Sequence, residues 1–229
     1  MKVLVTGATG FVGKKLVSEL VKRNHKVSIL PRDIESARKR LPMNCEFHKW
    51  EPELYPPSSQ ALDCINAVVH LAGENIADGR WSKSRKNKIK DSRVLSTRNL
   101  VSTLKSMKNP PDTFVSASAV GFYGKDKPVE LYEDLGPGKD FLADVCKEWE
   151  HEAFTARNHN IRTIALRIGI VLGYEGGAIK KMLPSFLGRR RRNFRRRESM
   201  DELGSHKRFG RNYYPLSRKQ NNPRGLQCH

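Results

Sequence analysis

The sequence predicts an α/β domain in which a parallel β-sheet carries helices on both faces. Three observations lead to this fold class. Short apolar, β-branched runs alternate with amphipathic stretches from the first residue onward, which is typical of a parallel sheet. The run AVVHLAG (67–73) is apolar almost throughout, as a strand buried on both faces would be. No internal repeat or proline-rich linker interrupts the pattern before Gly188, so we expect one domain over residues 1–187.

The individual elements follow in chain order. Strands are expected at KVLVT (2–6), KVSIL (26–30), 67–73, DTFVSAS (112–118) and RTIALRIGIVLG (162–173). Helices are expected at 11–24, where apolar residues recur at helical spacing, and at 82–108 and 139–158. Two prolines directly after the second helix should end it. His70 lies inside an apolar strand, so we expect a core histidine whose ring nitrogens are hydrogen-bonded.

The turn between the first strand and the first helix carries chemistry. The motif TGATGFVG places Gly7, Gly10 and Gly13 directly after a strand and at the opening of a helix. In that setting Gly7 permits the tight turn, Gly10 lets the backbone approach a pyrophosphate, and Gly13 lets the helix pack closely on the strand. Free amides at the helix start favour phosphates. We therefore predict a Rossmann-type dinucleotide site that includes Phe11 and Val12; a glycine-rich turn without a ligand is the alternative.

The end of the second strand indicates which dinucleotide is bound. In this architecture the tip of that strand faces the adenosine ribose, where a carboxylate binds the 2′-hydroxyl and an arginine accommodates a 2′-phosphate. Arg32 occupies this tip, and Asp33 follows it as a competing signal. We predict NADP as the cofactor, with NAD as the alternative.

Five segments, in order and at matching spacing, resemble the extended short-chain dehydrogenase/reductase superfamily. They are the glycine motif, HLAGENI (70–76), SASAVGFYG (116–124), DFLADVCKEWE (140–150) and LRIGIVLG (166–173). Within the superfamily they look like the NAD(P)-dependent epimerase/dehydratase-like branch of the SDR39U1 type. The resemblance covers essentially all of residues 1–187. It implies a doubly wound Rossmann-type sheet and an oxidoreductase or epimerase that transfers hydride at the nicotinamide C4 of its cofactor. The small-molecule substrate is unknown.

The resemblance also implies further cofactor-binding residues. Leu71, Ala72 and Gly73 end the strand expected at 67–73 and would pass beside the adenosine and its ribose. Arg93 stands where this branch places a cofactor-contacting arginine on the long helix. Val171 would lie near the nicotinamide. For Leu71 and Ala72, plain strand core is the competing interpretation.

The catalytic residues depart from the superfamily pattern. A typical member uses Tyr-x-x-x-Lys, in which the tyrosine exchanges a proton with the substrate oxygen and a nearby serine holds that oxygen. Here Lys147 has Ala143 four residues before it, so the usual hydroxyl is missing. Ser118 occupies the position of the serine, and Tyr123 in the following loop is the candidate acid/base. Ser116 is a further candidate, and an aromatic residue at position 123 could equally serve packing.

The end of the sequence changes character at Gly188. Residues 188–229 hold 13 Lys and Arg against 3 Asp and Glu, in a chain whose formal net charge is +19. Seven of the nine residues from Arg189 to Arg197 are arginine. Such a segment can bind nucleic acid through phosphate contacts or remain a solvated, disordered tail. In the branch named above, a glycine-rich stretch and a W-x-x-W-[VI]-H-x-x-D passage stand here instead.

A one-nucleotide shift of the reading frame explains the tail. Met200-Asp201 must be encoded ATG-GAY, whose +1 frame contains TGG, tryptophan. With permitted codons, SMDELGSHKRFGRNYY can be read in that frame as QWMSWVHIKDLVGII, the missing passage, and repeated AGG arginine codons become GGA, glycine. We therefore predict a frameshift near codon 188, either in the gene or in its sequencing. The domain would then be 1–187, followed by a basic, non-family tail at 188–229, and the C-terminal substrate region would be missing.

The remaining features limit the class of protein. No apolar run is long enough for a membrane span, the histidines and cysteines show no metal-ligand spacing, and cytoplasm is the expected compartment. The sequence thus predicts an NADP(H)-binding, epimerase/dehydratase-like oxidoreductase that is impaired in this chain. The alternatives are a non-catalytic NADP sensor and, less favoured, nucleic-acid binding through the tail. The oligomeric state is left open.

Overall fold

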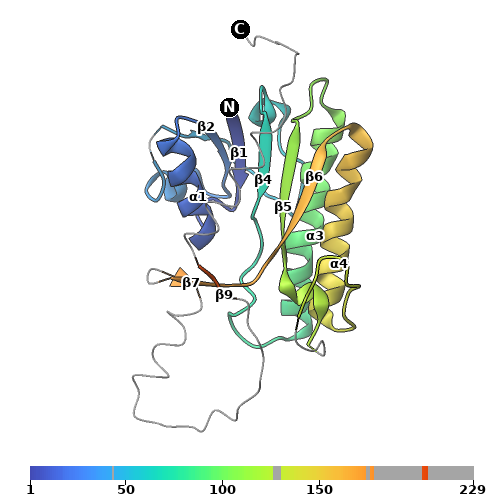
Figure 1. Ribbon diagram of the computed structural model, residues 1–229. Helices are drawn as coiled ribbons and strands as arrows, with labels where there is room; N and C mark the ends of the chain where they lie inside the picture. The colour runs from blue at the N-terminus through green and yellow to red at the C-terminus, as the bar shows by residue number, and fades with distance from the viewer. Residues whose placement is uncertain (43, 126–129, 174–175, 178–202, 206–229) are drawn as a thin grey trace, which may run out of the picture.

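The fold is built on a six-stranded, wholly parallel sheet with strand order β3-β2-β1-β4-β5-β6 (Figure 1). The structure, a computed structural model, describes residues 1–42, 44–125, 130–173, 176–177 and 203–205. The strands are β1 (Lys2–Thr6), β2 (Lys26–Leu30), β3 (Glu46–Phe47), β4 (Ala67–His70), β5 (Thr113–Ala119) and β6 (Arg162–Ile168). The order reverses between β1 and β4, which is the doubly wound topology of dinucleotide-binding domains. The predicted fold class is confirmed.

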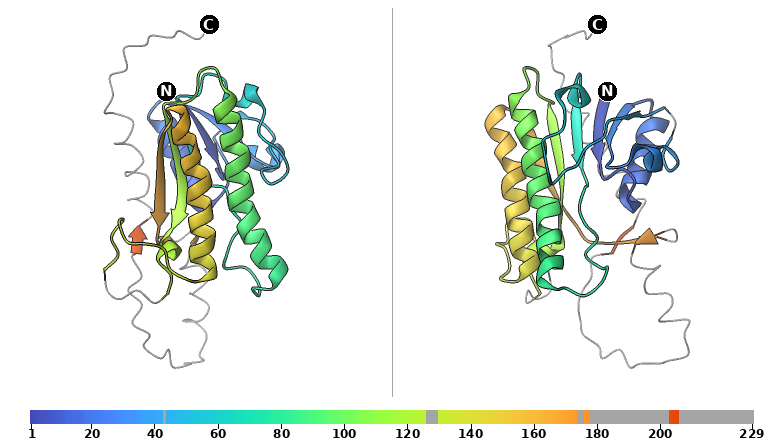
Figure 2. Two further views of the ribbon diagram at one scale, coloured as in Figure 1. Left: turned by 90° about the vertical axis from the view of Figure 1, so that its right-hand side faces the viewer. Right: turned by 180° about the vertical axis from the view of Figure 1, so that it is seen from behind.

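Helices cover both faces of the sheet. They are α1 (Phe11–Lys22), α2 (Ile34–Arg38), α3 (Lys83–Ser106) and α4 (Phe141–Phe154), with 3-10 turns η1 (Ser59–Leu62), η2 (Val120–Tyr123) and η3 (Thr155–His159). Figure 2 shows α3 and α4 side by side against one face, with α1 on the other. Ser82 and Asp140 begin α3 and α4 as side-chain caps, because each accepts hydrogen bonds from backbone amides of the first turn.

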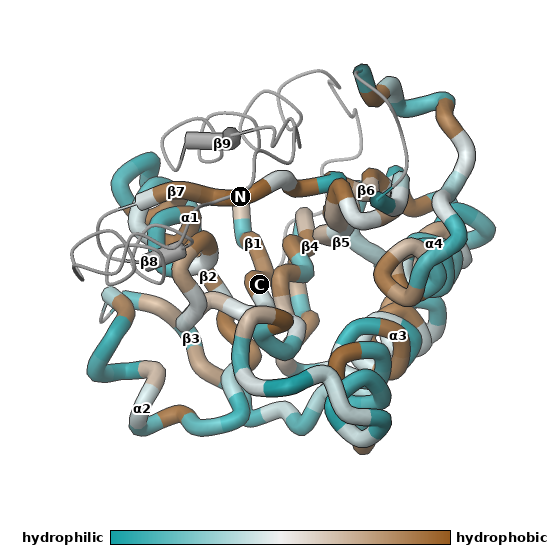
Figure 3. The backbone as a smooth tube through the Cα atoms, turned by 90° about the horizontal axis from the view of Figure 1, so that it is seen from below, coloured by the Kyte–Doolittle hydropathy of each residue, from teal (hydrophilic) through white to brown (hydrophobic). Residues whose placement is uncertain are grey.

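Two apolar layers result from the alternation of side chains along the central strands. In β1, Val3 and Val5 point into the layer under α1, whereas Leu4 points into the layer under α3. Figure 3 shows apolar residues concentrated along the strands, with hydrophilic residues on the outer helix faces. Among the described residues, no helix is both long and apolar enough to span a membrane.

The predicted strand at 162–173 is interrupted in the structure. It ends as β6 at Ile168, and the chain continues as β7 (Ile170–Gly173) in a separate small sheet. The break lies at Gly169, since a glycine inside a strand favours a bend. In this sheet β7 pairs with β8 (Gly176–Gly177) and, in parallel, with β9 (Leu203–Ser205). Figure 1 shows β7 crossing below α1, at the edge where β1 and β4 end.

The predicted tail at 188–229 falls almost wholly outside the described residues. Of residues 188–229, the structure describes only β9. The domain boundary at residue 188, the disorder of the tail and its arginine run therefore stay predictions.

Candidate functional site

The glycine turn has the geometry that the sequence predicts. Gly7 has φ +65°, and a Cβ on it would lie 2.6 Å from the carbonyl carbon of Leu71. A Cβ on Gly13 would lie 2.7 Å from Ala8 Cα. The amide of Gly10 donates to the carbonyl of Gly7 at 3.0 Å and closes the turn. A side chain at position 7 or 13 would thus push the first turn of α1 away from the sheet.

A cavity opens directly beside this turn, at the carboxyl ends of β1, β2 and β4. Its lining comes from segments far apart in the sequence: Gly7, Ala8, Thr9 and Gly10; Ile29, Leu30, Pro31 and Arg32; Trp50, Pro52 and Glu53; and Leu71, Ala72, Gly73, Glu74 and Ser92. In open α/β sheets this position, outside the strand ends where the strand order reverses, is where ligands bind. Most of the predicted cofactor-binding residues therefore surround one cavity.

Arg32 and Asp33, the two candidates for contact with the adenosine ribose, occupy different positions in the structure. Arg32 is exposed and lines the cavity. Asp33 is the N-cap of α2, and its Oδ1 accepts a hydrogen bond from the amide of Ser36 at 3.1 Å. Asp33 is not among the residues that line the cavity. The carboxylate of Asp33 is thus used by the helix start, whereas the guanidinium of Arg32 is the cationic side chain in a lining that also contains Glu53 and Glu74.

Leu71, Ala72 and Gly73 form the opposite wall of the cavity, beyond the end of β4. The Oγ1 of Thr6, the last residue of β1, accepts hydrogen bonds from the amides of Leu71 at 3.2 Å and Ala72 at 3.3 Å. A Cβ on Gly73 would lie 3.2 Å from the guanidinium carbon of Arg93. The sequence predicted this strand to reach residue 73, but β4 ends at His70. The amide of Leu71 still donates to the backbone carbonyl of Thr6 at 3.2 Å, and side-chain contacts hold the rest of the wall.

His70 is completely buried behind this wall, with 0% of its surface exposed. Its Nδ1 lies 2.7 Å from Thr6 Oγ1, and its Nε2 lies 3.3 Å from Ser96 Oγ on α3. Burial lowers the pKa of His70 to about 3, so the ring is neutral at neutral pH. The predicted core histidine, with both ring nitrogens hydrogen-bonded, is confirmed.

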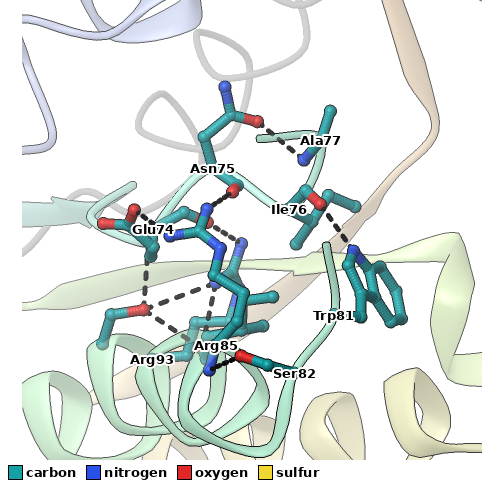
Figure 4. A network of polar contacts seen from close by, with 10 residues as sticks. Glu74, Asn75, Ile76, Ala77, Trp81, Ser82, Arg85 and Arg93 are labelled. Atoms are coloured by element: carbon teal, nitrogen blue, oxygen red, sulfur yellow. Dashed lines mark hydrogen bonds and ion pairs between the residues drawn. The ribbon is translucent and has the colours of Figure 1, made fainter. Parts of the chain in front are cut away.

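Arg93 lies behind the loop that follows β4 and is not among the residues lining the cavity (Figure 4). Its Nη2 donates to the carbonyl of Glu74 at 2.9 Å, and its Nη1 donates to the carbonyl of Ile89 at 3.0 Å. Its guanidinium carbon stands 5.3 Å from the ring centre of Trp149. Burial lowers the pKa of Arg93 from its ordinary value. In this conformation the guanidinium supports the loop from below.

A second arginine holds the same loop from the start of α3. Arg85 Nη1 donates to Glu74 Oε1 at 2.6 Å, and its Nη2 donates to the carbonyl of Asn75. Trp81 Nε1 donates to the carbonyl of Ile76 at 3.0 Å and closes the far end of the loop (Figure 4). Glu74 and Asn75 are thus tied to α3 through Arg85 and Arg93.

The two candidate catalytic residues belong to one polar cluster at the ends of β5 and β6. Ser118 Oγ donates to Glu150 Oε1 at 2.6 Å. Arg167 binds both carboxylate oxygens of Glu150 at 2.9 Å, and its Nη1 donates to the phenolic oxygen of Tyr123 at 2.8 Å. The hydrogen bond to Glu150 is the main cause that raises the pKa of Arg167. Burial raises the pKa of the neighbouring Cys146 thiol to about 11, so that thiol is protonated at neutral pH.

Ser116 and the two Tyr-x-x-x-Lys positions, Ala143 and Lys147, lie outside this polar cluster of Ser118, Tyr123, Glu150 and Arg167. Ser116 is buried, and its Oγ donates to the carbonyl of Ala117 at 3.1 Å. Ala143 is completely buried in the first turn of α4, whereas Lys147 is exposed. The lysine of the usual pair is therefore directed to solvent.

Val171 is half-buried on β7, which crosses the carboxyl edge of the sheet. Two residues later, a Cβ on Gly173 would overlap the ring of Phe11. Phe11 and Val12 are themselves half-buried in the first turn of α1. Val171 thus stands on a strand that meets the glycine turn, although it is outside the cavity lining.

Sequence reasoning did not assign a role to Arg167, Trp50 or Glu53, and it took Glu150 with Trp149 as helix packing plus a surface contact, whereas Glu150 is buried and paired with Arg167. Two signals could have found the ion pair: an arginine within the apolar run LRIGI, and a glutamate on the apolar face of α4. Trp50 and Glu53 follow the very short β3, where periodicity is too weak to place a side chain. No group of three potential metal ligands comes together within the described part of the chain.

The chain is similar to a known protein family and to several of its members. The sequence profile of the NAD dependent epimerase/dehydratase family matches residues 3–208. The chloroplastic epimerase family protein SDR39U1 homolog of Arabidopsis thaliana is 39% identical over 191 residues, which cover 81% of this chain and 53% of the relative. The epimerase family protein YfhF of Bacillus subtilis is 35% identical over 185 residues, covering 80% and 59%. The chain spans about half the length of these curated relatives.

Solved structures agree with this placement. The nucleoside-diphosphate sugar epimerase from Corynebacterium glutamicum is similar with a TM-score of 0.75 at 32% identity, covering 93% of this chain and 43% of that one. The human epimerase family protein SDR39U1 (isoform 2), solved with NADPH, gives a TM-score of 0.66 at 30% identity, covering 81% and 59%. Together with the parallel sheet and the glycine turn, these matches show that the chain belongs to the NAD dependent epimerase/dehydratase family, in the epimerase-like branch of the extended short-chain dehydrogenases/reductases.

Proposed function

We propose that this chain binds NADP(H) in the cavity beside the glycine turn, as the cofactor of an epimerase/dehydratase-like oxidoreductase. The exposed guanidinium of Arg32 at the cavity rim is the observation that carries this proposal. An arginine at this position accommodates a 2′-phosphate, and the competing carboxylate of Asp33 is used to cap α2. The human relative that was solved with NADPH supports the same cofactor.

The residues around the cavity are suited to a dinucleotide. The N-terminus of α1 directly follows the turn from Gly7 to Gly10, and the first turn of α1 contains no acidic residue that would repel a pyrophosphate. Leu71 and Ala72 offer a half-buried wall for the adenosine. When bound, the cofactor supplies hydride transfer at its nicotinamide C4.

The affinities of NADPH and NADH test this proposal. Replacing Arg32 by alanine should weaken NADPH binding by roughly 10-fold or more, since a charge-assisted contact to a phosphate is lost, and should leave NADH binding unchanged. Asp33→Ala is the matched control; it removes the cap of α2 and should not change the ratio of the two affinities. Equal losses for both cofactors in Arg32→Ala, or no loss, would contradict a 2′-phosphate contact.

Ser118 and Tyr123 are the side chains proposed to handle the substrate proton. Tyr123 accepts its hydrogen bond from Arg167, so the phenolic O–H stays available as a donor to a substrate oxygen. The proposed substrate is a small molecule, in line with the nucleoside-diphosphate sugar epimerase that this chain resembles.

A second function is favoured by Ala143, which leaves the usual acid/base position without a hydroxyl. The chain would then bind NADP(H) without turning over a substrate, as a sensor. A panel of carbonyl compounds and nucleotide sugars separates the two: NADPH binding with no consumption or formation of NADPH on any of them indicates the sensor.

We further propose that residues 1–187 form the family domain and that residues 188–229 are a non-family tail caused by a frameshift. The tryptophan codon in the +1 frame of Met200-Asp201, and the family passage that continues from it, support this proposal. Sequencing the locus tests it, because an intact frame without a neighbouring one-base insertion or deletion would contradict it. On this proposal, the tail's arginines carry no function in nucleic-acid binding.

A further inference from the structure

A buried chain of hydrogen bonds runs from the glycine turn through β4 to α3. Thr6, His70 and Ser96 each have 0% of their surface exposed. Thr6 immediately precedes Gly7, and Ser96 lies one turn of α3 beyond Ser92, which lines the cavity. Three elements that border the cavity are therefore joined through one imidazole ring.

The direction of each hydrogen bond can be assigned from the partners. Thr6 Oγ1 accepts from the amides of Leu71 and Ala72, so its lone pairs are used and its single proton must go to His70 Nδ1. In the neutral ring the proton is then on Nε2, which donates to Ser96 Oγ. Ser96 Oγ in turn donates to the carbonyl of Ser92 at 2.7 Å. In this arrangement every member of the chain is satisfied, and the carbonyl of Arg93, at 3.1 Å, is a second acceptor for the Ser96 hydroxyl.

This chain of hydrogen bonds affects the cavity through its wall at Leu71 and Ala72. β4 ends at His70. The Leu71 amide is shared between the backbone carbonyl and the Oγ1 of Thr6, each at 3.2 Å, and the Ala72 amide donates to that Oγ1 at 3.3 Å. Beyond Leu71 the wall is therefore held through the hydroxyl of Thr6. Free rotation of this hydroxyl would let it donate to other acceptors and lose its alignment with the two amides. Nδ1 of His70, as a fixed acceptor at 2.7 Å, removes that freedom.

We propose that His70 is a positioning residue for the dinucleotide: by orienting the Thr6 hydroxyl, it fixes Leu71 and Ala72 as the cavity wall facing the glycine turn. The inference rests on the proposed function, in which that cavity holds NADP(H). His70 does not touch the cofactor itself, because it is not among the cavity-lining residues. It acts through Thr6.

Two substitutions separate this role from simple filling of the core. In His70→Asn, the side-chain oxygen takes the place of Nδ1 and can still accept from Thr6, while the contact to Ser96 is lost. In His70→Gln, the side-chain nitrogen takes the place of Nε2 and can still donate to Ser96, while Thr6 loses its acceptor. Thr6→Val removes the hydroxyl itself, and Thr163→Val is a control that removes another buried hydroxyl, on β6, away from the cavity.

Each full-length variant is compared with the parent in NADPH affinity, in amide hydrogen exchange of the cofactor-free protein, and in thermal unfolding. His70→Gln and Thr6→Val should bind NADPH about 5- to 10-fold more weakly, the scale of one lost hydrogen bond, and should exchange the amides of residues 71–72 faster. His70→Asn should stay within about 2-fold of the parent in affinity. Thr163→Val should lower only the melting temperature.

These measurements distinguish a positioning role of His70 from a role in core packing alone. Equal effects of His70→Asn and His70→Gln on affinity and exchange, or loss of stability alone in both, would overturn the positioning role. If the parent does not bind NADPH, the proposed function fails, yet the exchange of residues 71–72 still decides whether His70 orders this wall. If a His70 variant does not fold, parent-like exchange and affinity in Thr6→Val would overturn the proposal.

Discussion

Arg167 donates a hydrogen bond of 2.8 Å to the phenolic oxygen of Tyr123. The same guanidinium is held in place by both carboxylate oxygens of Glu150, and Glu150 accepts the hydroxyl proton of Ser118. The two hydroxyls proposed to handle a substrate proton are therefore connected through one ion pair. A cation lies against the phenol although the lysine of Tyr-x-x-x-Lys, Lys147, is exposed.

Replacing Tyr123 by phenylalanine tests the proton-transfer role. On any substrate of the panel that the parent converts, turnover should fall by roughly 100-fold or more, the scale of general acid–base catalysis. NADPH affinity should stay unchanged, because Tyr123 does not line the cavity. Parent-like turnover in Tyr123→Phe, measured as NADPH absorbance, would leave this tyrosine a packing residue.

Replacing Arg167 by methionine should destabilise the fold strongly. Only 6% of the Glu150 side chain is exposed, so the variant would leave a buried carboxylate without its counter-charge, at a cost of about 3 kcal/mol. Urea unfolding measures this loss. The double variant Arg167→Met/Glu150→Gln should recover part of it, since the orphaned charge is removed; a double variant less stable than the single one would contradict an electrostatic cause.

Replacing Gly13 by alanine should impair both folding and cofactor binding. The new methyl group would overlap the backbone at Ala8, so α1 must shift away from the turn that presents its amides. We expect a loss of stability of about 1–3 kcal/mol from overpacking and weaker NADPH binding. Gly136→Ala is the matched control, because a Cβ there meets no atom within 4 Å; it should change neither quantity.

The buried His70 should make stability depend on pH. Its pKa is lowered from 6.5 to about 3 in the folded protein, so between these values the unfolded chain binds the extra proton. Its contribution to stability is therefore complete above pH 6.5 and is lost as the pH falls toward 3, with a slope of up to about 1.4 kcal/mol per pH unit. Urea unfolding from pH 7 to 4 should show a steeper decline in the parent than in His70→Asn. Parallel declines would show that His70 is not the group responsible.

Much of the fold could be predicted because its signals are local. The glycine spacing, the β-branched runs and the helix caps each act within a few residues, and the strands β1, β2, β4 and β5 lie close to their predicted positions. The site was predicted where it depends on that same backbone geometry, as at Gly7 and Gly13. Arg93 shows the limit: its place on α3 was clear, but its contact with the carbonyl of Glu74 depends on how a loop folds back over the helix.

By itself, the sequence determined the doubly wound class, the glycine turn and the arginine at the tip of β2, since these follow from periodicity and from backbone conformations that few residues allow. Only the tertiary structure decided how side chains from distant strands and helices meet. It joined Ser118 to Tyr123 through Glu150 and Arg167, and buried His70 between Thr6 and Ser96. The physical reason is that hydrogen bonds and ion pairs need alignment within a few tenths of an ångström, and packing of the whole domain sets that alignment.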